Sequence, residues 1–260
     1  FFSFFFVSAP FVVVASILTL AVGANQFNIH GLRIDTERAE AQALVDEFDE
    51  NDGIERPGFF KFAVVMTGLF VITIAATSVL PVIAPLGMGF VALSFAGVML
   101  LWFRSEVDVF YRTLDWDLLG FFVALFVVIN VMEHAGVLGL IGNGLTMLLS
   151  LGDTVGTGAL LVASAGFSSV TDNIPLAAML ARILDDMAVP SDSALWWSVV
   201  FGANLGGNLT PIGSASTLVA VTIIHKHGIN LSFAGFVKLA APYAILQIIL
   251  AVGYVLLFLV

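Results

Sequence analysis

Apolar residues occur along this chain in long runs that short polar stretches separate. A run of about 18–20 apolar residues is long enough to cross a lipid bilayer as a helix. We predict such spans over residues 1–23, 59–80, 82–103, 116–132 and 231–260. The pattern therefore predicts an all-α polytopic membrane protein.

The longest polar stretch, residues 25–58, connects the first two spans. Within it, residues 36–48 are rich in Ala, Glu and Gln and are predicted to form a helix, with Asp35 or Thr36 as its cap. Acidic residues gather at its end, over residues 46–55, which indicates a solvated acidic loop. Residues 104–115 are predicted to be a shorter charged link between spans.

Two short apolar segments, residues 155–169 and 176–187, flank a polar break that reads Thr-Asp-Asn-Ile-Pro. Neither segment has the length of a comfortable bilayer crossing. Together they predict a re-entrant helical hairpin over residues 153–188, capped at its start by Asp153 and Thr154. The glycine-rich apolar segment before it, residues 136–151, is predicted to lie at the membrane interface.

The next apolar segment, residues 195–226, is predicted to be a broken transmembrane helix. Its middle, residues 202–213, reads Gly-Ala-Asn-Leu-Gly-Gly-Asn-Leu-Thr-Pro-Ile-Gly. Glycine and proline interrupt the helix there, and lipid cannot satisfy the backbone polar groups that such an interruption exposes. Helix breaks of this kind lie beside protein or water-filled cavities, where secondary transporters place their sites.

Composition and charge agree with a membrane protein and indicate how it is oriented. The chain is 60% hydrophobic and 11% charged, whereas soluble domains carry about 25% charged residues. If the hairpin enters from outside, eight of the 9 Lys and Arg residues face the cytoplasm, Arg182 being the exception. We therefore expect a multi-pass protein of a prokaryotic plasma membrane, with the acidic loop in the cytoplasm.

Asp172 is the acidic residue that this arrangement places at membrane depth, at the hairpin tip. An ionisable residue inside a membrane is costly and therefore indicates function. The structural alternative is a cap of the following helix by Thr171, Asp172 or Asn173, with Pro175 in its first turn.

The polar residues of the broken helix suggest two kinds of ligand. Neutral side-chain oxygens beside freed backbone carbonyls suit Na⁺, whereas the positive end of the second half-helix suits an anion. A structural alternative is that Gly202 and Gly206 permit close helix packing. The predicted ion- or substrate-binding residues are Thr171, Asp172, Asn173, Asn204, Gly206, Gly207, Asn208, Thr210 and Ser214; Na⁺ is assigned to Asp172, Asn173, Asn204 and Asn208, and structural roles to Pro175, Pro211 and Gly213.

Signatures of enzymes are missing from the sequence. It contains no His-Glu-x-x-His zinc helix, no phosphate-binding loop and no Gly-x-Ser-x-Gly elbow. It also contains no cysteine, which excludes thiolate metal sites and disulfides within the chain. We expect no enzymatic activity, no cofactor beyond a coupling ion such as Na⁺ or H⁺, and no nucleic-acid partner.

Three stretches, residues 115–122, 171–175 and 202–213, resemble the second half of members of the ion transporter superfamily. That group includes arsenite permeases, NhaD-type sodium/proton antiporters, the melanosomal P protein, and citrate and dicarboxylate transporters. The Thr-Asp-Asn and Asn-Leu-Thr sequences of this chain are more similar to the arsenite and sodium/proton branches than to the Ser-Asn-Thr of the dicarboxylate branch.

This resemblance implies two inverted repeats, each with a hairpin and a broken helix, and an elevator-like movement against a dimeric scaffold. Residues 1–24 correspond to the last span of a first repeat that is otherwise missing, and residues 59–260 to the second repeat. We predict secondary transport of a small inorganic ion coupled to H⁺ or Na⁺, with Na⁺/H⁺ antiport first. The alternatives are arsenite or antimonite efflux, citrate or dicarboxylate transport, and a non-transporting membrane scaffold subunit. The expected partners are the lipid bilayer, the small ion and a second copy of the full-length protein.

Overall fold

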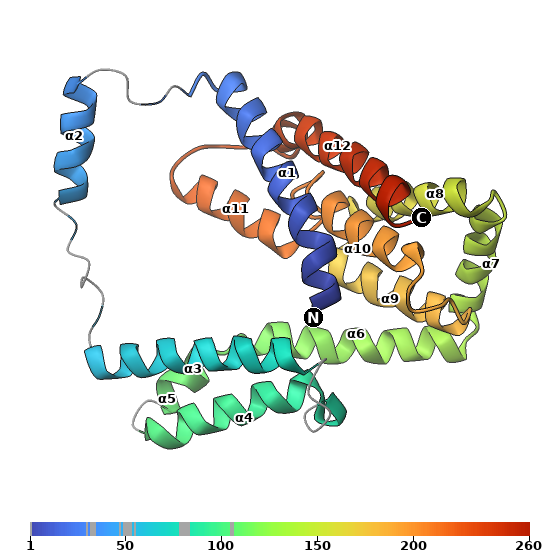
Figure 1. Cartoon of the computed structure of the whole chain (residues 1–260), viewed down its shortest axis with the longest axis horizontal. Helices are drawn as coiled ribbons and strands as arrows, with labels where there is room; N and C mark the ends of the chain where they lie inside the picture. Colours follow the sequence, from blue (N-terminus) through green and yellow to red (C-terminus); the bar gives the residue numbers. More distant parts are fainter. Residues whose placement is uncertain are drawn as a thin grey trace. The chain divides into compact units, whose positions relative to one another are not determined.

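The computed structural model describes residues 2–29, 31, 35–46, 48, 54, 56–77, 84–104 and 107–260 (Figure 1). In these ranges the chain forms α-helices and 3-10 geometry, the latter including the turn η1 (Ala84–Leu86), and no strand. Two compact units are present, Phe1–Asp115 and Trp116–Val260, and each is considered by itself. The prediction of an all-α polytopic membrane protein is confirmed.

The first unit contains the predicted acidic-loop helix and a pair of apolar helices. Its helices are α1 (Phe2–Gln26), α2 (Asp35–Asp46), α3 (Pro57–Ala76), α4 (Gly87–Trp102) and α5 (Val107–Thr113). Helices α3 and α4 pack through aromatic rings, with Phe62 stacked on Trp102 at a centroid distance of 5.4 Å. Most of the predicted acidic cluster lies outside the described residues.

Two expectations for the first unit are corrected. The third apolar segment forms a helix of only 16 residues, α4, rather than a helix over the whole of residues 82–103. Gly87 has a left-handed backbone, with φ of 74°, which separates α4 from the turn η1 before it. The charged link contains a short helix, α5, none of whose residues is buried; its Phe110 ring lies 6.3 Å from that of Phe59.

The second unit holds the two predicted helix breaks. Its helices are α6 (Trp116–His134), α7 (Val137–Leu149), α8 (Asp153–Ser168), α9 (Asn173–Asp186), α10 (Ala194–Gly206), α11 (Ala215–Lys226) and α12 (Phe233–Phe258). Residues 169–172 separate α8 from α9, and residues 207–214 separate α10 from α11. The two short helices and the two half-helices overlap the predicted segments, and their ends differ from the predicted ones by one to three residues.

The predicted cap of α8 is wrong. Its N-cap residue is Gly152, and Asp153 is already the first helical residue. The chain leaves α7 through Gly152, whose φ of 99° favours glycine, so the helix begins directly after this turn. Asp153 lies in the first turn, where its negative carboxylate interacts favourably with the positive end of the helix dipole.

Four of the described helices are long and apolar enough to cross a membrane: Phe4–Gln26 within α1, and α3, α6 and α12. Helices α4, α7 and α11 are apolar but shorter. Helix α3 has no buried residue although nearly all of its residues are apolar. An exposed apolar surface of this extent is suited to contact with lipid.

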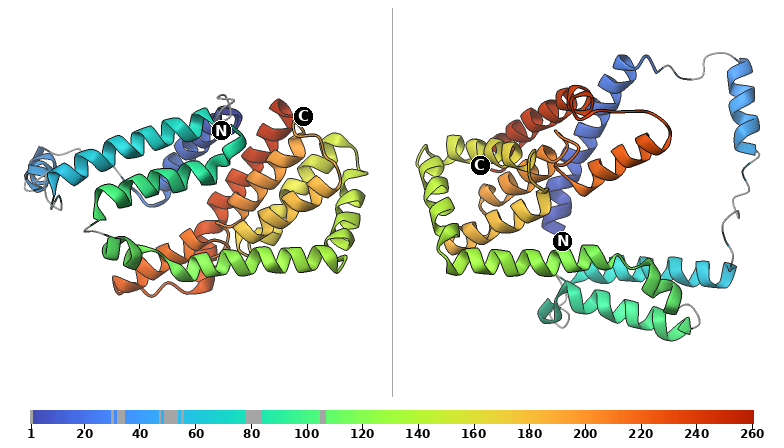
Figure 2. Two further views of the ribbon diagram at one scale, coloured as in Figure 1. Left: turned by 90° about the horizontal axis from the view of Figure 1, so that it is seen from below. Right: turned by 180° about the vertical axis from the view of Figure 1, so that it is seen from behind.

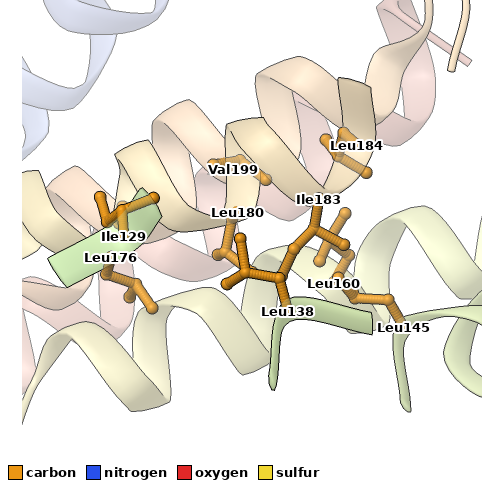
Figure 3. Packing of buried hydrophobic residues seen from close by; sticks show 10 residues of the cluster. Ile129, Leu138, Leu145, Leu160, Leu176, Leu180, Ile183, Leu184 and Val199 are labelled. Carbon is orange, nitrogen blue, oxygen red and sulfur yellow. The ribbon is translucent and has the colours of Figure 1, made fainter. Parts of the chain in front are cut away.

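The core of the second unit lies among helices α6 to α10. Side chains from all five helices converge there, including Leu138, Leu160, Leu180 and Ile183, each at most 7% exposed (Figure 3). Helices α8, α9 and α12 each contact α10, and they lie side by side with it (Figure 2). Helices α6 and α7 run along the edge of this group (Figure 2).

Helix α10 packs against α8 along their backbones. A Cβ atom at Gly202 would lie 2.5 Å from the carbonyl oxygen of Leu161, and one at Gly206 would collide with the backbone of Ala165. Only glycine permits so close an approach, which is the small-xxx-small packing that membrane helices use. The packing explanation for these two glycines is therefore confirmed.

Candidate functional site

The hairpin tip is organised by the cap of α9. Asp172 has an extended backbone, and its carboxylate oxygen Oδ1 accepts a hydrogen bond from the Ile174 backbone nitrogen at 3.1 Å. This is the side-chain cap that helix N-termini favour. Pro175 is the third helical residue, where the missing N–H costs no intrahelical hydrogen bond. The structural alternative for Asp172 is thus confirmed, and α9 begins three residues earlier than the segment predicted from Leu176.

The break between α10 and α11 is closed by a group of hydroxyl side chains. Ser214 caps α11, and its Oγ atom accepts from the Thr217 backbone nitrogen at 3.3 Å. The same atom lies 2.9 Å from Ser216 Oγ and 3.1 Å from Thr217 Oγ1. Thr217 Oγ1 lies 3.3 Å from the Pro211 carbonyl oxygen, so side chains replace part of the missing helical bonding.

The two breaks meet. The Asn173 backbone nitrogen donates to the Gly213 carbonyl oxygen at 3.2 Å, and the Asn173 side-chain amide lies 3.4 Å from Asn204 Oδ1. Thr210 Oγ1 donates to the Ser169 carbonyl oxygen at 2.5 Å. Hairpin and broken helix are therefore joined by three hydrogen bonds between residues that are 31 to 41 positions apart.

Glycine is required where the two breaks touch. A Cβ atom at Gly213 would lie 2.7 Å from the Gly207 carbonyl oxygen and 2.9 Å from that of Ser168. A Cβ atom at Gly207 would lie 2.8 Å from the Gly213 carbonyl oxygen. Backbone carbonyl groups thus crowd the junction, and the predicted structural role of Gly213 has a direct geometric basis.

The junction combines helix ends of opposite polarity. The carbonyl ends of α8 and α10 and the N–H ends of α9 and α11 all lie at the two breaks. Carbonyl ends are suited to a cation, and N–H ends to an anion. We call this place, formed by residues 168–174 and 204–214, the break junction.

The structure brings most of the predicted site residues to the break junction. Thr210 and Ser214 are buried, Asn208 is half-buried and Asn204 is exposed. Asn204 donates to the Val200 carbonyl oxygen at 2.7 Å, which fixes its amide and turns its oxygen toward Asn173. An exposed asparagine held in this way can present its oxygen to an incoming ion.

Other predicted site residues are not in direct contact with this group. The Thr171 hydroxyl donates to the Phe167 carbonyl oxygen at 2.9 Å, and Thr171 lines an apolar cavity of about 440 Å³ between α7, α8 and α9. Within the described ranges, no hydrogen bond joins the half-buried Asp172 to Asn204, Asn208 or Thr210. Gly206 faces the backbone of Ala165. Their roles in binding stay predictions.

Two buried serines that the sequence analysis passed over tie α8 to α10. Ser168 Oγ donates to the Ala203 carbonyl oxygen at 2.5 Å, and Ser198 Oγ donates to that of Thr157 at 3.0 Å. Both serines have an exposed fraction of 0%. A serine in an apolar helix is a weak signal on its own, because its usual partner is its own backbone.

A charged contact was also missed. Arg182 on α9 donates to both carboxylate oxygens of Glu133 on α6, at 3.0 and 3.1 Å. The two residues are 49 positions apart, so no local pattern indicates their pairing. Among the described residues, no group of three or more His, Cys, Asp or Glu side chains is placed to hold a metal ion.

The chain is similar to bacterial proteins that are named as transporters and to the P protein of mammals. The chain is 28% identical to an uncharacterized transporter of Mycobacterium tuberculosis over 94% of this chain and 56% of that protein. It is 31% identical to an uncharacterized transporter of Synechocystis over 60% of this chain and 40% of that protein. It is 25% identical to the P protein of Sus scrofa over 86% of this chain and 28% of that protein. No solved structure matches significantly.

The chain thus spans little more than half the length of the mycobacterial transporter that it resembles. The model of the citrate transporter family, CitMHS, matches residues 1–202, which include helices α8 and α9 and end within α10, before the break that follows it. The resemblance to the ion transporter superfamily, drawn from the hairpin and broken-helix residues, is confirmed. The chain belongs to the CitMHS citrate transporter family.

Proposed function

We propose that this chain supplies one half of the transport site of a secondary transporter for a small ion, coupled to H⁺ or Na⁺. The observation that carries the proposal is the meeting of two helix breaks at the break junction. Within a membrane, non-helical backbone persists only where it is buried in protein or lines a cavity. Discontinuous helices with this arrangement form the substrate and ion sites of transporters.

Na⁺/H⁺ antiport is the preferred reaction. Hard cations bind to oxygen ligands, and the junction offers the Asn204 amide oxygen, the Thr210 hydroxyl and the carbonyl oxygens of Gly207 and Gly213. Asp172 is the ionisable side chain of the junction. A proton and a sodium ion would compete there, because protonation removes the charge that attracts the cation.

A second candidate is transport of citrate or another carboxylate. The family match supports this candidate, and so do the N–H ends of α9 and α11 with their capping residues Asp172 and Ser214. The negative charge of Asp172 opposes it, because a carboxylate substrate would be repelled unless a cation bound between them. Arsenite or antimonite efflux and a non-transporting scaffold role are separated from these candidates by the experiment below.

The wider arrangement is also a proposal. Helices α8 to α12 would move as a transport body in a multi-pass protein of a prokaryotic plasma membrane. Its partners would be the bilayer, the small ion and a second copy of the full-length protein, with residues 25–58 in the cytoplasm. The extent of apolar exposed surface on α3 and α6 supports contact with lipid.

Ion-driven proton movement tests the proposed reaction. The full-length protein is reconstituted into liposomes that contain a pH-sensitive dye, and Na⁺, Li⁺, citrate or arsenite is added outside. We expect Na⁺ or Li⁺ to move protons in the wild-type protein and in the control variant Asp192→Asn, which removes an exposed loop carboxylate. Asp172→Asn should show no such movement.

The other possible outcomes of this experiment distinguish the alternative functions. Uptake of citrate without any response to cations alone would support carboxylate transport, and movement of arsenite would support efflux. An intact response in Asp172→Asn would remove this carboxylate from the coupling mechanism. If the protein is folded and correctly inserted but no added ion moves protons or is taken up, the scaffold role remains.

A further inference from the structure

The Glu133–Arg182 ion pair joins helix α6 to helix α9, which belongs to a group of closely packed helices in the second unit. Glu133 lies in the last turn of α6, and Arg182 lies in the C-terminal half of α9. The guanidinium donates through Nε at 3.1 Å and through a terminal nitrogen at 3.0 Å, one bond to each carboxylate oxygen. Such bidentate pairs are the geometrically most specific contacts between arginine and a carboxylate.

On one side of this pair is a tightly joined body. Helices α8 and α10 touch through their backbones at Gly202 and Gly206, and two buried serines add hydrogen bonds between them. Helix α9 is attached at the break junction through Asn173. Helix α12 packs on the same body, with side chains of Val252 and Leu256 against Gly158 of α8. Contacts between backbones leave little freedom for these helices to move separately.

On the other side, α6 meets α9 through side chains and around an open space. A cavity of about 290 Å³ lies between the two helices. Ile129 is the buried α6 residue of the apolar core (Figure 3), and Leu125 and Met132 of α6 pack against that core while partly exposed. Unfilled space lowers the cost of a relative shift, because fewer packed contacts have to be broken. The cavity is lined by Phe126, Ile129, Asn130, Glu133, Ala178 and Arg182.

Arg182 has a second carboxylate within reach on its own helix. Its other terminal nitrogen lies 3.8 Å from Asp185 Oδ2, one turn along α9. The side chains of Arg182, Glu133 and Asp185 are 46%, 30% and 72% exposed, so protein encloses none of them, and Glu133 and Asp185 lie at the ends of their helices. Release of Glu133 would therefore leave the guanidinium beside a carboxylate, which lowers the cost of breaking the pair.

We propose that the Glu133–Arg182 pair is an exchangeable latch between α6 and the body of helices α8, α9, α10 and α12. The latch is closed in this structure. When the body shifts against α6, Arg182 leaves Glu133 and pairs with Asp185, and the cavity between α6 and α9 opens. The shift is the movement that the proposed transport function requires, and in this respect the inference rests on that function.

A cysteine placed in the cavity reports the opening. The chain contains no cysteine, so Ala178→Cys provides a single reactive group once any cysteines elsewhere in the full-length protein are replaced. The rate at which a small maleimide modifies the introduced thiol is measured in proteoliposomes, in four backgrounds. These are the native sequence, Glu133→Gln, Asp185→Asn and the control Asp192→Asn, which changes an exposed carboxylate in the loop after α9.

The latch predicts an order of rates. Glu133→Gln should be modified about two- to fivefold faster than the native background, the range that a partly exposed ion pair contributes to an equilibrium. Asp185→Asn should be modified more slowly, because Arg182 loses its alternative partner, and Asp192→Asn should be unchanged. Added salt should accelerate modification in the native background but not in Glu133→Gln, because salt screens the ion pair.

A purely structural contact would give a different result. Equal rates in Glu133→Gln and the native background, or rates in the native background that do not respond to salt, would overturn the latch. Its failure is distinguishable from failure of the proposed function. If the protein transports no ion but shows this order of rates, the transport proposal is wrong and the latch is supported. If transport is normal but the rates are equal, only the latch is wrong.

Discussion

Replacing Gly206 with alanine should separate α10 from α8. In the structure, a Cβ atom at this position collides with the carbonyl oxygen, the Cα and the carbonyl carbon of Ala165, all of which belong to the backbone. A flexible side chain could rotate away from such a contact, whereas a helix backbone has to move as a whole. The neighbouring hydrogen bond from Ser168 to Ala203 spans the same interface and would be stretched by the movement.

The expected loss of stability is worked out by comparing Gly206→Ala with a control variant. Overpacking a close interface costs about 1–3 kcal/mol, while alanine gains up to about 1 kcal/mol over glycine in a helix interior. Gly166→Ala is the control, because Gly166 is also helical and nothing lies within 4 Å of its Cβ position. Subtracting the control cancels the helix-propensity gain, so Gly206→Ala should be less stable than Gly166→Ala by about 1–3 kcal/mol.

Thermal unfolding of the purified full-length protein measures this difference. The apparent melting temperature of Gly206→Ala should lie several degrees below that of Gly166→Ala, and saturating Na⁺ should not remove the gap, because the clash lies in the packing. Equal melting temperatures for the two variants would refute the close packing of α8 and α10. A gap that closes on addition of Na⁺ would assign Gly206 to the ion site instead.

Three further predictions concern the break junction. Asp172→Ala should lower stability by about 1 kcal/mol through loss of the α9 cap, whereas Asp172→Asn should keep the cap; chemical denaturation compares them, and equal stabilities would contradict the capping role. Ser168→Ala should cost about 0.5–1.5 kcal/mol in the same assay, because it removes a buried hydrogen bond while the Ala203 carbonyl keeps its bond from the Gly207 backbone nitrogen, and an unchanged stability would count against the serine's contribution. Asn204→Ala should weaken Na⁺ binding in a titration of the solubilised protein while the exposed Asn143→Ala does not, and equal affinities would exclude the Asn204 oxygen as a ligand.

The helix breaks could be predicted from the sequence because they depend on local chemistry. Glycine, proline and capping side chains act on their own neighbours, so the Thr-Asp-Asn-Ile-Pro sequence indicates a cap and its helix without knowledge of the fold. Asp172 and Ser214 both cap the helices that follow them, as such reasoning expects. The same reasoning placed the cap of α8 wrongly, because the φ of 99° at Gly152 depends on how α7 and α8 are oriented.

The contacts between the breaks could not be predicted in the same way. Asn173 meets Asn204, Ser168 meets Ala203, and Glu133 meets Arg182 across 31, 35 and 49 positions respectively. Such pairs depend on how the intervening helices pack, and the hydrophobic periodicity of the sequence gives no information about that packing. Thr171 shows the same limit: its hydroxyl donates to the Phe167 carbonyl oxygen near the end of α8, and the residue lines an apolar cavity to which Asn204 does not contribute.

Sodium binding at several pH values tests whether Asp172 and the break junction form one site for Na⁺ and H⁺. Binding of radioactive sodium to the purified full-length protein gives the apparent affinity of the native protein and of Asp172→Asn. For a shared site, the affinity of the native protein should fall as the pH is lowered, because protons compete for the carboxylate, and Asp172→Asn should bind weakly with no such dependence. Sodium binding in Asp172→Asn with native strength and native pH dependence would contradict a shared site.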